Sequence, residues 1–241
     1  MKIKYIILFI IFILASCSNK NKEPTIESKY IKAHNKILKK NYYEAALEFE
    51  ELIEDYPFEE LSIKGQIMAS YAYYMQDQYD KTLEIIENFT TLNPSHKNID
   101  YILYLKAISY YEQIPEIYRS QDMAKNSYFA FDNLIKRYPK SIYIKDAKQK
   151  KHQSYESIVS GIIDKAKFKT KNHNYIGAIN DYLSIISNYS DSKHVSQSYY
   201  RIIEIYINLG ITKEANLLLE QLNKKYPDDF WTKLAHKLNY S

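Results

Sequence analysis

Amphipathic segments that end in the same way recur along this 241-residue chain. Four of them run into a proline, and the fifth, "YIGAINDYLSIISNYS", has a serine in the equivalent place. The segment ends are Pro57, Pro94, Pro139, Ser190 and Pro227. Proline cannot continue a helix, because it lacks a backbone N–H and its ring clashes with the preceding turn. The recurring ends therefore predict a series of helices, each followed by a break.

Three positions keep their chemistry when the segments are aligned on these ends. Twelve residues before the end lies a small residue, and an apolar residue lies both eight and five residues before it. The small residues are Ala45, Thr82, Ser127, Ala178 and Ala215. The apolar residues are Phe49, Ile86, Phe131, Tyr182 and Leu219, then Leu52, Phe89, Leu134, Ile185 and Leu222. Apolar residues three apart share one helix face, and we expect a neighbouring helix to pack closely there.

A second amphipathic run, such as "SKYIKAHNKILKK", precedes each of these segments. Successive segment ends are 37, 45, 51 and 37 residues apart. A helix-turn-helix repeat of about 34 residues with short insertions fits this spacing and resembles the tetratricopeptide pattern. Only four glycines occur, which also favours helices over tight-turn β structure. We therefore predict an all-α fold, a tetratricopeptide-like solenoid of about five repeats, rather than an unrelated helical bundle with chance prolines.

The N-terminus has the three-part layout of a secretory signal peptide: Lys2 and Lys4, an apolar run over residues 5–14, and a small pair before Cys17. The apolar run is well short of the roughly 20 residues that a membrane-spanning helix needs. The sequence "LASC" resembles the lipobox of bacterial lipoproteins, in which the cysteine is acylated and becomes the first mature residue. The alternative is an ordinary cleaved signal with an incidental cysteine.

These features divide the chain into a lipoprotein signal peptide (1–16), a lipidated flexible tether (17–28) and a tetratricopeptide-repeat domain (29–241). Ser18 stands where an Asp would resemble an inner-membrane retention signal. We therefore expect a lipid-anchored protein on the periplasmic face of the outer membrane.

Composition and motifs argue against several functional classes. Without Lys2 and Lys4, 31 basic residues face 29 acidic ones, and nothing in this balance points to nucleic acid. Cys17 is the single cysteine, so a disulfide within the mature chain is excluded. The histidines show no metal-ligand spacing, and no nucleophile or phosphate-loop motif occurs. We predict no catalytic residue, no metal and no cofactor; an enzyme that uses Cys17 as its nucleophile is the alternative.

Repeats of this type stack so that one surface is concave and binds partners. Tyrosines on the first helices of the repeats are candidates to line that surface, because tyrosine offers a large contact area and a hydroxyl group. They are Tyr71, Tyr73, Tyr74, Tyr104, Tyr110 and Tyr111. The alternative is that most of them pack between repeats.

The stretch "LNPSHKNIDYILYLKAISYYEQIPEIYRSQDM", residues 92–123, is more specific than repeat sequence in general. It resembles the BamD family of outer-membrane assembly lipoproteins, whose middle repeat carries Pro-x-His, then Asp-Tyr, then an aromatic-rich helix. The matching residues here are Pro94, His96, Asp100, Tyr101, Tyr104 and Arg119. Residues 56–74 and 200–215 also agree, so the resemblance, with the lipobox, covers the mature chain in order.

The resemblance implies a non-enzymatic scaffold in the machinery that inserts β-barrel proteins into the outer membrane. It implies that the C-terminal repeats dock on a BamA-like barrel protein and that the N-terminal repeats receive unfolded outer-membrane proteins. The candidate substrate-binding residues are Phe58, Tyr71, Tyr73, Tyr74 and Tyr104, and the candidate partner-interface residues are Asp181, Arg201 and Glu204.

Two positions depart from the family pattern. Asp181 stands where the family commonly has Arg, and Leu61 stands where it has Tyr. Arg201 is also expected to serve in packing or in an intramolecular ion pair. A periplasmic tetratricopeptide adaptor for envelope division or cell-wall machinery remains the alternative function, because the repeats and the anchor fit it equally well.

Overall fold

The computed structural model describes residues 24–114 and 121–238. Cys17, the signal peptide and Arg119 lie outside these ranges, so the predictions made for them stay predictions.

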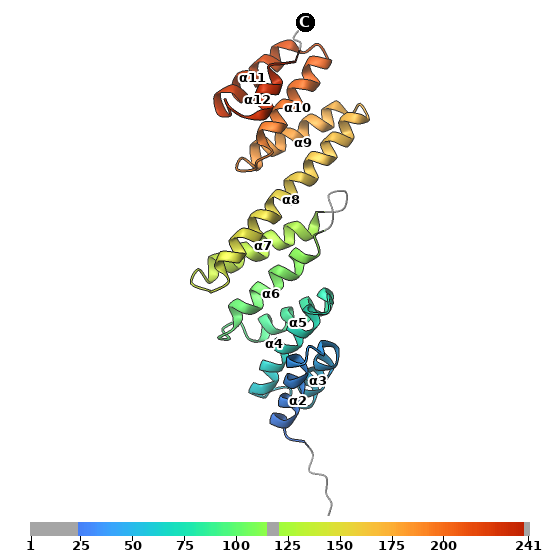
Figure 1. The fold of residues 1–241 in the computed structure, drawn as a ribbon, viewed down its shortest axis with the longest axis vertical. Helices are drawn as coiled ribbons and strands as arrows, with labels where there is room; N and C mark the ends of the chain where they lie inside the picture. Colours follow the sequence, from blue (N-terminus) through green and yellow to red (C-terminus); the bar gives the residue numbers. More distant parts are fainter. Residues whose placement is uncertain (1–23, 115–120, 239–241) are drawn as a thin grey trace, which may run out of the picture. The chain divides into compact units, whose positions relative to one another are not determined.

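The described residues fold into eleven α-helices, which follow one another as five helix pairs and a short final helix (Figure 1). The first helices of the pairs are α2 (Ile26–Leu38), α4 (Glu60–Tyr74), α6 (Ile99–Glu112), α8 (Ile144–Lys171) and α10 (Val195–Asn208). The second helices are α3 (Tyr42–Asp55), α5 (Tyr79–Leu92), α7 (Asp122–Arg137), α9 (Tyr175–Asn188) and α11 (Thr212–Lys225), and α12 (Phe230–Ala235) ends the series. The prediction of an all-α, tetratricopeptide-like solenoid of about five repeats is confirmed.

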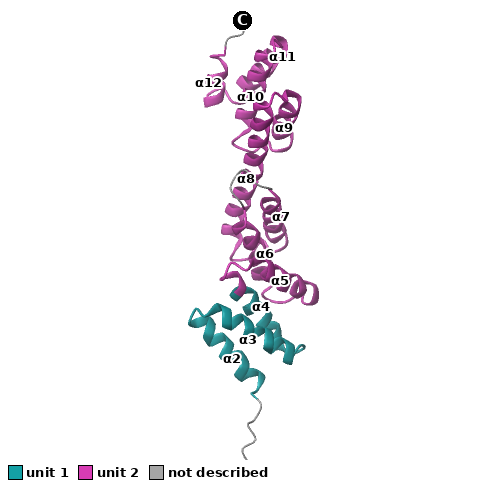
Figure 2. Cartoon of the chain, turned by 90° about the vertical axis from the view of Figure 1, so that its right-hand side faces the viewer, with its two compact units in different colours: residues 1–72 teal, residues 73–241 magenta. Residues whose placement is uncertain are grey.

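The chain divides into two compact units, Met1–Ala72 and Tyr73–Ser241 (Figure 2). In the first unit α2 packs against α3. In the second unit each helix from α5 to α11 contacts the next one, α6 also reaches α8, and α12 lies against α10 and α11.

The repeated positions found in the sequence form the core of these pairs. All five small residues are completely buried, from Ala45 to Ala215, and so are nine of the ten apolar residues to within 1% exposure. Leu219 in α11 is partly buried. A small residue where two helices lie closest lets their surfaces interdigitate. The apolar residues one and two turns later fill the space beside it.

The turns inside four of the five repeats share one backbone geometry. Each contains one residue with positive φ, namely Lys40 (59°), Asp77 (58°), His173 (58°) or Gly210 (73°). In every case the next residue donates its N–H to the carbonyl five residues earlier, as Asn41 does to Lys36 at 2.9 Å. This left-handed closure ends a helix while satisfying its last carbonyls.

The irregular spacing of the repeats has two structural causes. Helix α8 is 28 residues long, twice the length of α9, and this places the fourth segment end 51 residues after the third. Helices α6 and α7 are separated in the sequence by residues 113–121, a longer connection than the one inside each of the other four pairs.

The predicted tether ends too late. Helix α2 begins at Ile26, because the Thr25 side chain accepts the Ser28 N–H and caps it, so residues 26–28 are helical. None of the helices in the described ranges is long and apolar enough to span a bilayer.

Candidate functional site

Tyr104 and Tyr111, two of the predicted lining residues, project from α6 toward α8. The Tyr104 hydroxyl donates to the Asp146 carboxylate at 2.7 Å, and its ring stacks on Tyr143 with centroids 4.7 Å apart. The Tyr111 hydroxyl donates to Gln153 at 2.9 Å. Both tyrosines therefore hold α8 against α6, which is the alternative that the sequence left open.

The surroundings of Tyr104 and Asp146 shift the pKa values of both side chains. Burial and the hydrogen bond to Asp146 raise the pKa of Tyr104 well above its ordinary value. Burial alone would raise the pKa of Asp146, but hydrogen bonds from Tyr104 and Lys150 lower it below the usual value. The pair is thus kept as a neutral phenol beside a carboxylate over a wide pH range.

The other predicted substrate-binding residues differ in their exposure. Phe58 is 95% exposed. Tyr71 is half-buried with its ring 6.1 Å from that of Tyr42, and Tyr74 is half-buried against Tyr79. Tyr73 is 1% exposed, so its prediction as a surface-lining residue is wrong. Successive helix residues point about 100° apart, and therefore Tyr73 and Tyr74 cannot face the same way.

The predicted partner-interface residues all have intramolecular partners. Asp181 in α9 pairs with Lys169 of α8 at 2.6 Å. Arg201 pairs with Glu204 at 2.8 Å. The guanidinium also lies over the rings of Tyr200 and Trp231, at 5.2 and 5.6 Å. This is the packing and ion-pair role expected of Arg201, and it leaves both members of the pair about 30% exposed, at 31% and 29%.

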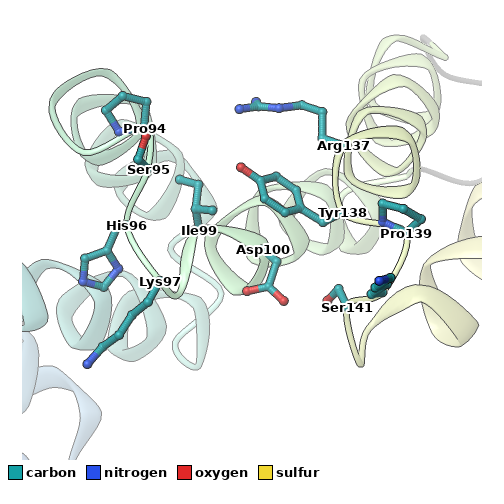
Figure 3. Close-up of a pocket in the computed structure, with 11 residues that line it drawn as sticks. Pro94, Ser95, His96, Lys97, Ile99, Asp100, Arg137, Tyr138, Pro139 and Ser141 are labelled. Carbon is teal, nitrogen blue, oxygen red and sulfur yellow. The ribbon is translucent and has the colours of Figure 1, made fainter.

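The family-like "NPSHKNID" stretch forms one wall of a groove of about 790 Å³ between two turns (Figure 3). It is lined by Pro94, Ser95, His96, Lys97, Ile99 and Asp100 on one side and by Arg137, Tyr138, Pro139, Lys140 and Ser141 on the other. Within the first turn, the His96 ring packs edge-on against Phe89 (5.3 Å), and its Nδ1 accepts the Asn98 N–H. The motif histidine therefore shapes the turn itself.

Arg137 lies at the end of α7, and its side chain extends over the Tyr138 ring toward Pro94 (Figure 3). The guanidinium lies 5.4 Å from the centre of that ring. The Lys97 side chain points away from Arg137. Arg137 and Pro94 also belong to a second hollow of about 490 Å³, which runs over α6 between α5 and α7. Because the two hollows share these residues, we treat them as one site, the α5–α7 groove.

The helix side of the α5–α7 groove is lined mainly by polar side chains. They are Thr90 and Thr91 at the end of α5, Lys106 and Tyr110 on α6, and Asn126, Asn133 and Arg137 on α7, with Leu103, Phe129 and Ala130 between them. Across both hollows the lining contains four cationic side chains, Lys97, Lys106, Arg137 and Lys140, and one carboxylate, Asp100. The groove is therefore electropositive.

Sequence reasoning missed the α7 side of this groove. The signal was present in "NSYFAFDNLIKR", where positions 126, 130, 133 and 137 follow the spacing of one helix face. Only the apolar face of this segment was used to define the repeat. In the parts of the chain that the structure describes, no group of three or more His, Cys, Asp or Glu side chains is placed to hold a metal ion.

Comparison with known proteins gives consistent matches over almost the whole chain. The Caulobacter vibrioides outer membrane protein assembly factor BamD is 28% identical over 232 residues, which cover 93% of this chain and 76% of that protein. The factor of the same name from Rickettsia prowazekii is 28% identical over 236 residues, with 96% and 94% covered. The one from Neisseria meningitidis is 29% identical over 196 residues, with 77% and 73% covered.

A family model described as outer membrane lipoprotein, YfiO, matches residues 22–233. This range contains every described helix except the last residues of α12. The resemblance found in the sequence is confirmed: the chain belongs to the YfiO family of outer membrane lipoproteins.

Proposed function

We propose that this chain is a non-enzymatic scaffold lipoprotein of an outer-membrane β-barrel assembly complex. The observation that carries the proposal is the match to the outer membrane lipoprotein family over residues 22–233, together with relatives named as assembly factors over most of their length. The helix pairs suit this role, because stacked repeats offer long surfaces for several partners.

Acylation of Cys17 would hold the scaffold at the periplasmic face of the outer membrane. Each buried CH₂ group of an acyl chain contributes about 0.8 kcal/mol, so two or more chains give a stable anchor. Cys17→Ala should release the protein from washed membranes, and the mass of the wild-type N-terminal peptide should include lipid. An unmodified thiol on Cys17 in the mature protein would contradict the anchor.

Two partner surfaces belong to the proposal. The C-terminal repeats would bind a BamA-like barrel protein near Arg201 and Glu204, which are partly exposed. The N-terminal repeats would bind unfolded outer-membrane proteins, for which the fully projecting Phe58 is the best placed of the candidates. Exposed aromatic side chains shield the apolar strands of such substrates from water.

Depletion of the protein tests the function directly. We expect porin-like barrels to disappear from the outer membrane and to return when the wild-type chain is supplied. A pull-down from detergent-solubilised envelope should also recover a barrel protein with periplasmic domains. Normal barrel levels after depletion, with division or cell-wall enzymes in the pull-down, would favour the adaptor function instead.

Residue-level tests separate the two surfaces. Arg201→Ala with Glu204→Ala should lower recovery of the barrel partner, while Phe58→Ser should lower crosslinking to unfolded substrate. Ile142→Ser is the matched control for Phe58, because Ile142 is another exposed apolar residue (85%) outside the proposed surfaces.

A further inference from the structure

Helix α7 presents a polar row to the α5–α7 groove. Asn126, Ala130, Asn133 and Arg137 are spaced by four, three and four residues, so they lie on one face. All four line the groove. Ala130, whose side chain is small, lies between the two asparagines in this row.

The polar side chains of this row have no hydrogen-bond partner among the residues that the structure describes. No hydrogen bond or ion pair within the described residues involves the side chains of Asn126, Asn133 or Arg137, and none involves Lys106 opposite them. Asn126, Asn133 and Arg137 are exposed, and Lys106 is half-buried. By contrast, Lys136 and Lys125, on other faces of the same helix, both pair with aspartates.

The two kinds of side chain recognise different parts of a ligand. An asparagine amide offers donors and an acceptor together, which matches the N–H and C=O of an extended backbone. Arg137 can bind a carboxylate through two parallel N–H donors, and Lys106 adds a second positive charge. Exposed Phe129 and half-buried Tyr110 would cover apolar side chains between the charged ones, whereas Leu103 is buried.

We propose that the α5–α7 groove binds an extended, acidic peptide segment of a partner protein. Asn126 and Asn133 hold its backbone, and Arg137 and Lys106 neutralise its carboxylates. The linked hollows favour a peptide over a lipid headgroup, because a single phosphate would occupy one cation and leave the asparagine row unused. This site does not depend on the assembly function proposed above.

Fluorescence anisotropy with defined peptides tests the proposal on the full chain purified in detergent. The probe is a fluorescein-labelled nine-residue peptide in which Glu alternates with Thr and Val, and its partner probe has Gln in place of every Glu. We expect the wild-type chain to bind the acidic probe at least about tenfold more tightly, as charge-assisted contacts would give. The difference should shrink as salt is raised.

Three double variants assign the contacts. Lys106→Gln with Arg137→Gln should abolish the preference for the acidic probe. Asn126→Ala with Asn133→Ala should lower the affinity for both probes by about tenfold, because the asparagines are proposed to contact the peptide backbone, which is the same in both probes. Lys125→Gln with Lys136→Gln removes the same charge from α7 outside the groove and should change either affinity less than about twofold.

Several outcomes would overturn the proposal. One is equal binding of the two probes by the wild-type chain, or no binding of either. Another is an equal loss of affinity for the acidic probe in Lys106→Gln with Arg137→Gln and in Lys125→Gln with Lys136→Gln. Such a result would mean that the overall charge of the protein, rather than the groove, determines binding. Displacement of the acidic probe by soluble dihexanoylphosphatidylglycerol, in preference to unlabelled acidic peptide, would make the groove a headgroup site. Circular dichroism should show unchanged helix content in every variant, because the substituted side chains are exposed or, for Lys106, half-buried.

Discussion

Helix α6 borders two polar surfaces that are built in opposite ways. Toward α8, the hydroxyls of Tyr104 and Tyr111 donate to Asp146 and Gln153, and the Tyr104 ring stacks on Tyr143. The Tyr111 ring lies edge-on to Phe131 of α7. Toward α5 and α7, Lys106 lines one groove with two asparagines and Arg137, and none of these side chains makes a hydrogen bond or ion pair within the described residues, although Arg137 lies over the Tyr138 ring. The first surface was predicted to bind ligands, whereas on the second only Tyr110 was a predicted lining residue and the α7 side was missed.

The difference shows that residue type alone does not identify a binding surface in a repeat protein. A tyrosine whose hydroxyl and ring are both occupied stabilises the contact between two repeats. A polar side chain without a partner contributes little to folding and is free to meet a ligand. Substitutions on the Tyr104 side should therefore change stability, and those on the groove side should change binding.

The largest expected effect comes from Tyr104→Ala. This change removes the stacked ring and the bond to Asp146, and we expect the free energy of unfolding to fall by about 2–3 kcal/mol. Urea unfolding followed by circular dichroism measures it. If Tyr104→Ala were no more destabilising than Asn133→Ala, the assignment of Tyr104 to the framework would be wrong.

A smaller effect is expected from the charge of Asp146. Asp146→Asn should lower the free energy of unfolding by about 1 kcal/mol at neutral pH. Because the pKa of Asp146 is lowered in the folded chain, its contribution is complete above about pH 4 and is lost as the pH falls through the lowered pKa. The pKa of Tyr104 is raised, so its contribution is complete below about pH 10 and is lost as the pH rises through the raised pKa.

Unfolding of wild type and Asp146→Asn across the acid range checks this dependence. The difference between the two proteins should shrink as the pH falls below about 4, the ordinary pKa of aspartate, and through the lowered pKa of Asp146. Asn133→Ala serves as the control, since it removes no ionisable group. A difference that stayed constant down to pH 2 would show that Asp146 acts through packing rather than charge.

Tyr111→Phe should have a still smaller effect, about 0.5 kcal/mol. The phenylalanine keeps the ring contact with Phe131 and loses the hydrogen bond to Gln153. The double variant Tyr111→Phe with Gln153→Ala should lose less free energy of unfolding than the sum of the losses in the two single variants. Strict additivity in this double-mutant cycle would argue that the bond contributes nothing.

The smallest effects on stability are expected in the groove. Arg137→Gln and Asn133→Ala should each change the free energy of unfolding by less than about 0.5 kcal/mol, because neither side chain is buried or bonded within the described chain. Thermal melting of both variants beside the wild type measures this. A loss above 1 kcal/mol would mean that the groove is part of the framework after all.

Local sequence rules predicted the repeat framework well, because its determinants are close together in the chain. Ala45, Phe49 and Leu52 lie within two helical turns, and the proline after them marks where the helix stops. Even the unequal repeat lengths were visible as spacing between ends. The left-handed residues Lys40, Asp77 and His173 were not identified, since none is the glycine that usually marks such a turn.

The candidate sites were predicted less well, because they depend on side chains that are distant in sequence. Tyr104 was correctly placed on a first helix, but its partner Asp146 is 42 residues away. Nothing in either local sequence indicates that the hydroxyl is already occupied. Asp181 was noted as an unusual residue, and only the position of Lys169 on α8 shows that it forms an intramolecular pair.

The sequence by itself determined that this chain is a series of helix-turn-helix repeats of one family, since periodicity and breakers act over a few residues. The tertiary structure decided which polar and aromatic side chains are hydrogen-bonded or packed within the described residues and which are available to bind a partner. That distinction requires the distances between helices, because a side chain is free only when no other part of the chain satisfies it.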